Sequence, residues 1–184
     1  MIVEEERYML KGHEVVLRCP RPEDAEMLIA YLKQVTGETR FLFCESDEVE
    51  YTTESELEFL KEHNEAEDAL LLLAFVDGEH AGNCSFNSKG GASRRAKHRA
   101  EVGIALRQKF TGCGLGRLMM ESLMKHVEAA GYEQAELVVV ESNERAYHLY
   151  ETLGFKECGR IPNGNKYDDG TYLDDIFMVK FFKS

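Results

Sequence analysis

The stretch from Glu101 to Gly131 limits the folds that this chain can adopt. It begins with an apolar, β-compatible run at Val102–Leu106 and continues through Gly112, Gly114 and Gly116 into an amphipathic helical pattern. Glycines before a helix let the backbone approach a ligand closely and leave several N–H groups without intrahelical partners. Because these groups lie at the positive end of the helix dipole, the loop is suited to bind a phosphate or pyrophosphate.

The charge balance argues against broad anionic partners. The formal net charge is −12, and the content of 43% hydrophobic and 30% charged residues is ordinary for a soluble globular protein. This negative charge disfavours a nucleic-acid or anionic-membrane surface. The basic stretch Lys89–Arg99 is a local exception. It is expected to be either a solvated loop or a flap that contacts a phosphate-bearing ligand or an acidic acceptor.

Length and cysteine content indicate one domain in a reducing compartment. The chain of 184 residues is long enough for a single domain with a sizeable core, expected over residues 1–184. The five cysteines are odd in number and form no C-x-x-C pair, so neither a disulfide framework nor a metal site is predicted. The longest apolar run, Ala69–Val76, is too short to span a bilayer, and Met1–Glu6 is acidic where a secretory signal is basic. We therefore expect a cytoplasmic protein with no membrane partner.

Hydrophobic periodicity predicts a mixed sheet flanked by helices. The expected strands span residues 13–18, 69–76, 80–86, 102–106, 135–140, 155–158 and 171–182, and the expected helices span 20–37, 53–64, 115–130 and 143–153. In the second helix, Leu57 and Leu60 should face the core, with Thr53 or Ser55 as the cap. The dipeptide Asp77-Gly78 predicts a hairpin, and the later strand–helix–strand connection should be parallel and right-handed.

The glycine spacing excludes two phosphate-binding loops. A P-loop ends in Gly-Lys-Ser/Thr, whereas Gly116 is followed by Arg117 and Leu118. A dinucleotide-binding G-x-G-x-x-G motif would place Arg117 or Met119 at its third glycine. Glu141, an acid at the end of the next strand, fits dinucleotide binding, but most of the chain precedes the loop.

Two motifs instead resemble the GNAT (N-acetyltransferase) superfamily. Residues 111–117, Thr-Gly-Cys-Gly-Leu-Gly-Arg, are similar to its acyl-CoA signature R/Q-x-x-G-x-G/A, with Thr111 at the position usually held by Arg or Gln. Residues 143–155 resemble the N-x-x-A-x-x-x-Y-x-x-x-G-F element that follows the next strand in this superfamily. The resemblance covers roughly residues 15–182. It implies an α/β (α+β) fold with a mixed, largely antiparallel sheet of six to seven strands and about four helices.

The resemblance also implies a site for acetyl-CoA. The pantetheine arm would pair with the backbone at Ile104, Ala105 and Leu106. The backbone amides of the loop would hold the pyrophosphate, and they belong to Gly112, Cys113, Gly114, Leu115, Gly116 and Arg117. Asn143 is a natural helix N-cap and, by resemblance, also contacts the cofactor arm. Arg117 is expected either to reach a CoA phosphate or to be a solvated helix residue.

Two residues are the candidates for catalysis. By resemblance, the Tyr150 hydroxyl lies near the thioester sulfur, although its helical position also fits core packing. Glu101 is the candidate base that deprotonates the amine through a water, because an alkylamine of pKa about 10.4 must be neutral to attack. The alternative for Glu101 is a solvated carboxylate or an ion pair with Arg99, and Glu141 is a weaker candidate base.

We therefore predict an acetyl-CoA-dependent N-acetyltransferase that transfers its acetyl group directly to a primary amine. The competing prediction is a non-catalytic acyl-CoA-binding module of the same fold. The acceptor would be a small molecule or a peptide, and the acidic surface favours a cationic one. Ribosomal-protein acetyltransferases of the superfamily carry a glutamate where this chain has Val138, which argues against that subtype. The strand at 171–182 is expected to lie at a sheet edge, where it could pair across a homodimer.

Overall fold

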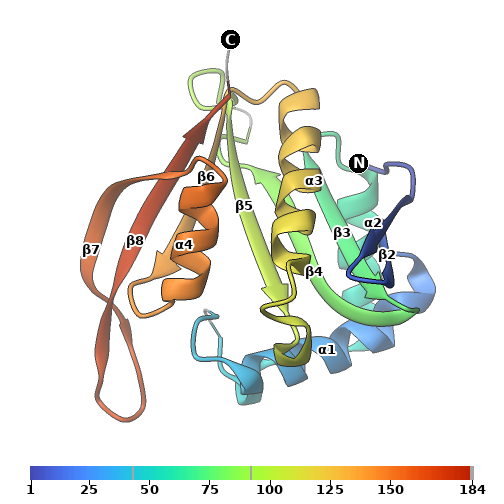
Figure 1. The fold of residues 1–184 in the computed structure, drawn as a ribbon, viewed down its shortest axis with the longest axis horizontal. Coiled ribbons are helices and arrows are strands. Elements are labelled where there is room, and N and C mark those ends of the chain that lie inside the picture. The colour runs from blue at the N-terminus through green and yellow to red at the C-terminus, as the bar shows by residue number, and fades with distance from the viewer. Residues whose placement is uncertain (43, 92, 183–184) are drawn as a thin grey trace. The chain divides into compact units, whose positions relative to one another are not determined.

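The computed structural model describes residues 1–42, 44–91 and 93–182, which form eight strands and four α-helices (Figure 1). The strands are β1 (Glu6–Leu10), β2 (His13–Arg18), β3 (Ala69–Val76), β4 (Glu79–Ser88), β5 (Arg99–Leu106), β6 (Gln134–Val140), β7 (Lys156–Lys166) and β8 (Tyr172–Phe181). The α-helices are α1 (Ala25–Glu38), α2 (Thr53–Glu65), α3 (Leu115–Ala129) and α4 (Glu144–Thr152). Short 3₁₀ turns are η1 (Pro22–Asp24), η2 (Ser46–Glu48) and η3 (Gln108–Phe110).

The strands follow the order β1-β2-β3-β4-β5-β6-β8-β7. The sheet is mostly antiparallel, and β5 pairs with β6 in parallel, as the predicted crossover through α3 requires. The mixed α/β class is thus confirmed, with one or two strands more than predicted. The additional strand β1 pairs with β2 and was not recognised in the sequence.

The chain groups into two compact units, which are described separately below. Unit 1 comprises Met1–Asn87 and Gly103–Leu123, and unit 2 comprises Ser88–Val102 and Met124–Ser184. The boundaries fall inside β5 and inside α3. That residues 1–184 form a single domain stays a prediction.

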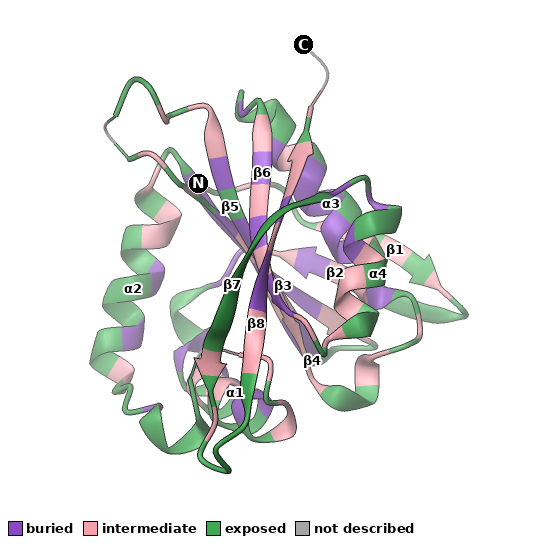
Figure 2. Ribbon diagram, turned by 90° about the vertical axis from the view of Figure 1, so that its left-hand side faces the viewer, coloured by how far each residue is buried: buried purple, intermediate pink, exposed green. Residues whose placement is uncertain are grey.

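In unit 1, α1 and α2 cover one face of the strands and the first turns of α3 cover the other (Figure 2). Part of the core lies between α1, α2 and β3, where Leu28, Leu60 and Leu73 are buried together. The buried side of α1 also includes Tyr31 and Val35. Burial of such apolar side chains stabilises the layers by about 25 cal/mol per Å².

The predicted orientation of α2 is partly wrong. Leu60 is buried as expected, but Leu57 is 38% exposed, and Glu56 is the other buried residue of the helix. The buried face of the helix is therefore rotated by about 50°, half the angle between consecutive residues, from the apolar stripe that the sequence suggested. Its N-cap is Thr52, whose side chain accepts a hydrogen bond from the Ser55 backbone at 3.1 Å.

The hairpin between β3 and β4 forms where the sequence predicts it. Asp77 and Gly78 have φ angles of 48° and 82°, the left-handed values that a two-residue hairpin turn needs. The antiparallel register then slips between Ala74 and Phe75, which marks an irregularity opposite the start of β4. This irregularity lies beside the contacts that hold the end of β5.

In unit 2, β8 is an interior strand, so the expectation that residues 171–182 form a sheet edge is wrong. β8 pairs with β6 on one side and with β7 on the other. The edge is β7, which is exposed along nearly its whole length (Figure 2). Its proline, terminal lysines and two register irregularities are features that discourage edge-to-edge pairing.

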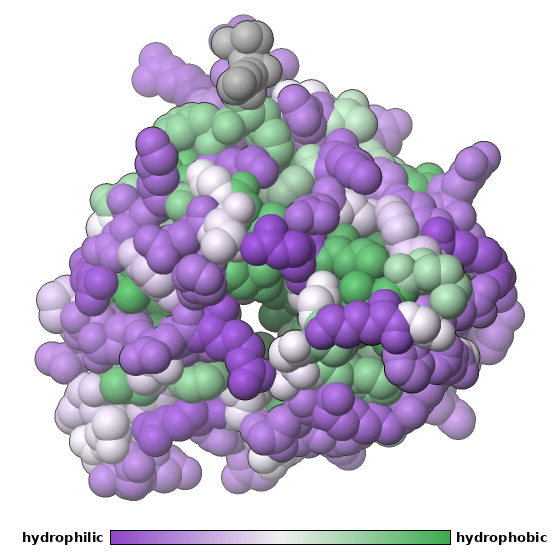
Figure 3. All heavy atoms as spheres, viewed as in Figure 1, coloured by the Kyte–Doolittle hydropathy of each residue, from purple (hydrophilic) through white to green (hydrophobic). Residues whose placement is uncertain are grey.

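One face of the molecule can be judged for its polarity from Figure 3. The face seen in Figure 3 is mostly hydrophilic, with scattered hydrophobic residues. None of the helices in the described ranges is both long and apolar enough to cross a bilayer. The five cysteines are all free thiols, and Cys19 and Cys84 are buried.

Candidate functional site

The glycine loop of unit 1 is open on its outer side. Gly112 and Gly114 have φ angles of +76° and +100°, in the left-handed region that favours glycine. A Cβ atom placed on Gly112 would meet no atom within 4 Å, and one on Gly114 would meet only the Leu10 side chain, at 3.7 Å. A ligand can therefore approach the backbone here closely.

The first turn of α3 supplies hydrogen-bond donors beside this opening. The helix begins at Leu115, and the first amide with an intrahelical acceptor is that of Leu118, which donates to the Gly114 carbonyl at 3.2 Å. The three preceding N–H groups therefore have no acceptor within the helix. No acidic side chain lies in this first turn to compete for them. The loop and helix fit the pyrophosphate of a nucleotide cofactor.

The other loop residues fold the loop on itself. The Thr111 hydroxyl donates to the Gln108 carbonyl at 2.8 Å, and the Cys113 thiol donates to the Phe110 carbonyl at 3.1 Å. Cys113 is thus a packing residue of the turn. Arg117 lies 3.5 Å from Glu121 on the next turn of α3, as a partly exposed helix residue.

The end of β5 is held from two sides within unit 1. The Arg107 amide donates to the Ala81 carbonyl at 2.9 Å, and the Tyr31 hydroxyl donates to the Ala105 carbonyl at 2.8 Å. Ile104, Ala105 and Leu106 are half-buried. Sequence reasoning did not single out Tyr31, because an aromatic residue on the inner face of a helix is ordinarily core.

Glu101 lies in unit 2 on the first half of β5, with its side chain about half exposed. Its carboxylate pairs with the Lys89 ammonium. The predicted ion pair with Arg99 is wrong, because the Arg99 guanidinium makes a bidentate contact with Glu136. Glu136 lies opposite Glu101 on β6, so Arg99 balances one of two adjacent carboxylates and Lys89 balances the other.

Asn143 and Tyr150 both belong to α4 in unit 2. The Asn143 side chain caps this helix by accepting a hydrogen bond from the Ala146 backbone at 3.3 Å. Tyr150 is buried, and its ring packs on Phe155 with a centroid distance of 5.9 Å. Burial raises the pKa of Tyr150 to about 12, so its hydroxyl stays protonated at neutral pH. The Tyr150 ring therefore packs in the core, as its helical position in the sequence also allowed.

Glu141 and the backbone of His98 make structural contacts. Glu141 accepts a hydrogen bond from the Asp174 amide at 3.1 Å, which ties the end of β6 to β8. The His98 carbonyl accepts a hydrogen bond from the Glu133 amide at 2.9 Å. Within residues 1–42, 44–91 and 93–182, no group of three or more His, Cys, Asp or Glu side chains is arranged to hold a metal ion.

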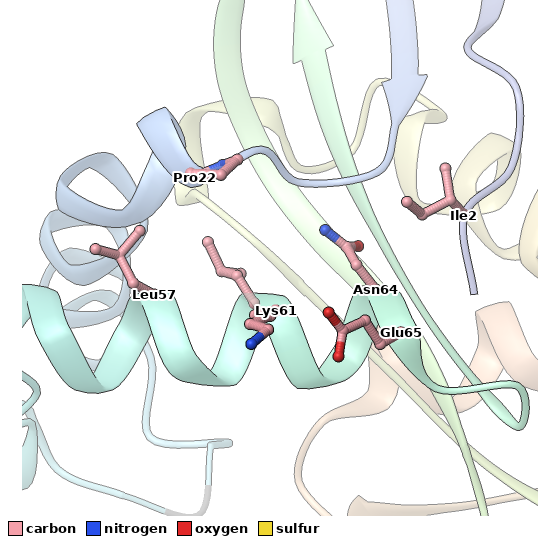
Figure 4. A pocket seen from close by; sticks show the side chains of 7 residues that line it. Ile2, Pro22, Leu57, Lys61, Asn64 and Glu65 are labelled. Atoms are coloured by element: carbon pink, nitrogen blue, oxygen red, sulfur yellow. The ribbon is translucent and has the colours of Figure 1, made fainter.

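A separate hollow of about 260 Å³ lies over α2 in unit 1 (Figure 4). It is lined by Ile2, Pro22, Leu57, Leu60, Lys61, Asn64 and Glu65. None of these residues was predicted to bind the cofactor or to act in catalysis. The open loop and the first turn of α3 therefore remain the better candidate for a cofactor site.

Comparison with known proteins agrees with this geometry. Residues 28–155 match the model of the acetyltransferase (GNAT) family. The chain belongs to the GNAT family. The match covers more than half of the chain and includes the glycine loop, Asn143 and Tyr150.

Individual GNAT relatives extend this result. The chain is 32% identical over 106 residues to an N-alpha-acetyltransferase of Sulfurisphaera tokodaii, over 54% of this chain and 64% of that protein. The matched part is thus slightly less than two thirds of that relative. A solved GNAT acetyltransferase from Streptococcus pneumoniae is 28% identical, with a TM-score of 0.85 over 91% of this chain and 99% of that one.

A more distant solved structure is a ribosomal L7/L12 alpha-N-protein acetyltransferase in complex with coenzyme A. It shares 18% identity and a TM-score of 0.76 with this chain, over 96% of this chain and 98% of that one. At this identity the likeness concerns the fold alone.

Proposed function

We propose that this protein is an acetyl-CoA-dependent N-acetyltransferase that transfers an acetyl group directly to a primary amine. The observation that carries the proposal is the open glycine loop at Gly112 and Gly114, which leads into a helix N-terminus without acidic side chains. Membership of the GNAT family supports the same reading. The bound acetyl-CoA would supply an activated acetyl thioester.

The donor-binding residues lie mostly in unit 1. The backbone amides of Gly112–Arg117 would bind the pyrophosphate, and the backbone of Ile104–Leu106 would pair with the pantetheine arm. In unit 2, the Asn143 side chain is proposed to contact the cofactor on the strength of its place in the family motif. Its capping contact uses only its oxygen and leaves the amide hydrogens available as donors.

Tyr150 would steady the departing thiolate by a hydrogen bond. The pKa of Tyr150, raised to about 12 by burial, makes the phenol a poor acid toward a thiolate whose conjugate thiol has a pKa near 8.5. Complete proton transfer would therefore be uphill by about 5 kcal/mol. A donated hydrogen bond has no such cost, so it is the role that this environment favours.

Glu101 would be the base that accepts the amine proton through a water. Its half-exposed carboxylate can exchange protons with solvent, and its contact with Lys89 fixes its position on β5. The Lys89 ammonium competes with the attacking amine for this carboxylate.

The first test is transfer itself. Incubating the protein with acetyl-CoA and a panel of amines should release free thiol in proportion to acetylated amine. CoA binding without thiol release would favour a non-catalytic acyl-CoA-binding module. Absence of CoA binding in calorimetry would refute both functions.

Substitution at Tyr150 tests its role. Tyr150→Phe keeps the ring in the core and should lower kcat by about tenfold to a hundredfold, with CoA affinity nearly unchanged. Phe155→Leu is the matched control, because it disturbs the same ring contact and leaves the hydroxyl in place. An unchanged kcat in Tyr150→Phe would leave Tyr150 as a core residue only.

Substitution at Glu101 tests the base. Glu101→Gln should lower kcat/KM for an alkylamine and move the acidic limb of its pH–rate profile. The control Glu136→Gln removes the neighbouring carboxylate, which contacts Arg99. A pH–rate profile identical to that of the wild type would eliminate Glu101 as the base.

The acceptor is proposed to be cationic. Residues 45–68 contain eleven acids and one lysine, a net charge of −10. Most of these acids project from η2 and α2, and Tyr51 and Phe59 of the same segment are also exposed. Such a surface attracts amines that carry additional positive charge, such as a basic peptide.

A further inference from the structure

Helix α1 contacts the segment that leads into the glycine loop at two points. The Tyr31 hydroxyl donates to the Ala105 carbonyl at 2.8 Å, and the Glu38 carboxylate accepts a hydrogen bond from the Gln108 amide at 2.6 Å. Tyr31 and Glu38 are seven residues apart, which is two helical turns, so they project from the same side of α1. One helix face therefore holds both ends of residues 105–108.

Tyr31 is held rigidly at the first contact. Its side chain is only 1% exposed, and its ring meets the His80 ring edge-to-face at 4.7 Å. Burial raises the pKa of Tyr31, although the nearby Asn83 amide acts in the opposite direction. The hydroxyl therefore remains a protonated donor to Ala105 throughout the physiological pH range.

Glu38 is also fixed at the second contact. While one carboxylate oxygen accepts from the Gln108 amide, the other accepts from the Gln34 side chain at 2.6 Å. Glu38 is the last residue of α1, so the contact is made at the end of the helix. Because an acceptor for a backbone amide fixes the peptide plane, the entry into η3 is set by α1.

Residues 105–108 are also packed against β4, which leaves them little room to move. A Cβ atom on Gly82 would lie 2.4 Å from the Ala105 oxygen and 2.9 Å from the Leu106 Cα, so β4 already packs against this backbone. The segment leads through η3 to Gly112, four residues after Gln108. Its position therefore determines where the loop amides point.

We propose that Tyr31 and Glu38 are positioning residues for the acyl-CoA donor. By fixing residues 105–108, they would present the pantetheine-binding backbone and the loop amides in one preorganised arrangement. Neither side chain needs to touch the donor. The inference rests on the proposed function, because it assumes that this backbone binds acyl-CoA.

The first variant removes only the buried hydroxyl. Tyr31→Phe should weaken CoA binding in calorimetry and raise KM for acetyl-CoA by about fivefold, while kcat at saturating donor stays within about twofold. The matched control is Thr36→Val, which also removes a buried hydroxyl of α1. The Thr36 hydroxyl donates to the Leu32 carbonyl at 2.8 Å, within the helix and not to residues 105–108.

Comparison of the two variants separates positioning from stability. Both should lower Tm, but only Tyr31→Phe should change CoA affinity. Equal CoA affinity in Tyr31→Phe and the wild type, with a lower Tm, would overturn the inference and leave Tyr31 as a structural residue.

The second variant tests the other end of the segment. Glu38→Ala, at a partly exposed helix end, should raise KM for acetyl-CoA by about threefold to tenfold, whereas the exposed Glu26→Ala at the start of α1 should not. An unchanged KM in Glu38→Ala would remove Glu38 from the proposal. If the wild type itself fails to bind CoA, the proposed function fails; if it binds and the variants bind equally well, only the positioning role fails.

Discussion

Glu56 is an unusual residue because it faces the buried side of a helix without a counter-charge. It is 5% exposed, and among the described residues no ion pair or hydrogen bond to its carboxylate offsets that burial. Burial accordingly raises the pKa of Glu56 above its ordinary value. A carboxylate in this setting destabilises the fold when it is ionised.

The pH dependence of this effect follows from linkage. Since the folded pKa of Glu56 is above the unfolded one, the folded state loses stability as pH rises from the unfolded value, near 4.3, through the folded value. Glu56→Gln should therefore raise Tm by about 2–4 °C at pH 7, corresponding to about 1 kcal/mol. Thermal denaturation at several pH values is the measurement.

The control for this prediction is Glu58→Gln, an exposed position on the same helix. Its Tm should differ little from that of the wild type, both at pH 7 and below about pH 4. The gain from Glu56→Gln should disappear below about pH 4, where the wild-type side chain is already protonated. An equal gain in Tm at pH 7 and below about pH 4 would show that the charge of the Glu56 carboxylate is not the cause of the gain.

The residues of the candidate site could be proposed only in part from the sequence. The glycine loop, Asn143 and Tyr150 follow from short motifs, which specify residue type and spacing. Tyr31 and Glu38 do not, because their partners are backbone groups about 70 residues away, and no local pattern encodes such a contact. The burial of Glu56 was missed because a carboxylate counts as polar in any periodicity argument.

At the scale of elements, the close approach of β4 to the end of β5 restricts the position of residues 105–108. Gly82 allows it, because any larger residue would place a Cβ atom within 2.4 Å of the Ala105 oxygen and 2.6 Å of the Leu106 side chain. The backbone atoms involved cannot move without disturbing the Tyr31 contact. This part of the sheet is therefore intolerant of side-chain volume.

The corresponding prediction is that Gly82→Ala destabilises the protein by about 2–3 kcal/mol and weakens CoA binding. Gly103→Ala is the matched control on β5, since a Cβ atom there would meet nothing within 4 Å. Denaturant unfolding should show the loss for Gly82→Ala alone. Equal stability of the two variants would mean that β4 and β5 can separate at little cost.

Element boundaries were predictable where periodicity is strong. The cores of α3, α4, β3 and β6 lie close to their predicted ranges. β7 is much longer than the strand predicted at 155–158. The prediction was too short because Pro162, Gly164 and Asn165 indicate a turn in the sequence. Pairing with β8 overrides these local preferences, with register irregularities between Ile161 and Asn165.

At the scale of the whole molecule, charge is distributed unevenly. Of the net charge of −12, residues 45–68 contribute −10. In this segment, η2 contacts the side of α1, and α2 contacts α1 and β3. The acidic surface is therefore anchored on the same helix that contacts residues 105–108.

We predict that kcat/KM for a cationic peptide acceptor falls severalfold as ionic strength rises from about 30 to 300 mM, because the added salt screens exposed charges. An amine of similar size that carries hydroxyl groups and no additional positive charge should show a much smaller change. Steady-state rates at matched pH provide the comparison. The same salt dependence for both acceptors would argue against recognition by this surface.

The clustering of acidic residues in one segment also affects how the protein behaves in solution. The chain outside residues 45–68 carries a net charge of only −2, so this segment accounts for most of the low isoelectric point of about 5.0. Mutual repulsion between copies of the protein, and hence its colloidal solubility near neutral pH, depends chiefly on these 24 residues. A basic acceptor that covers them would neutralise this repulsion while it is bound, so the enzyme–acceptor complex should be closest to precipitation during turnover.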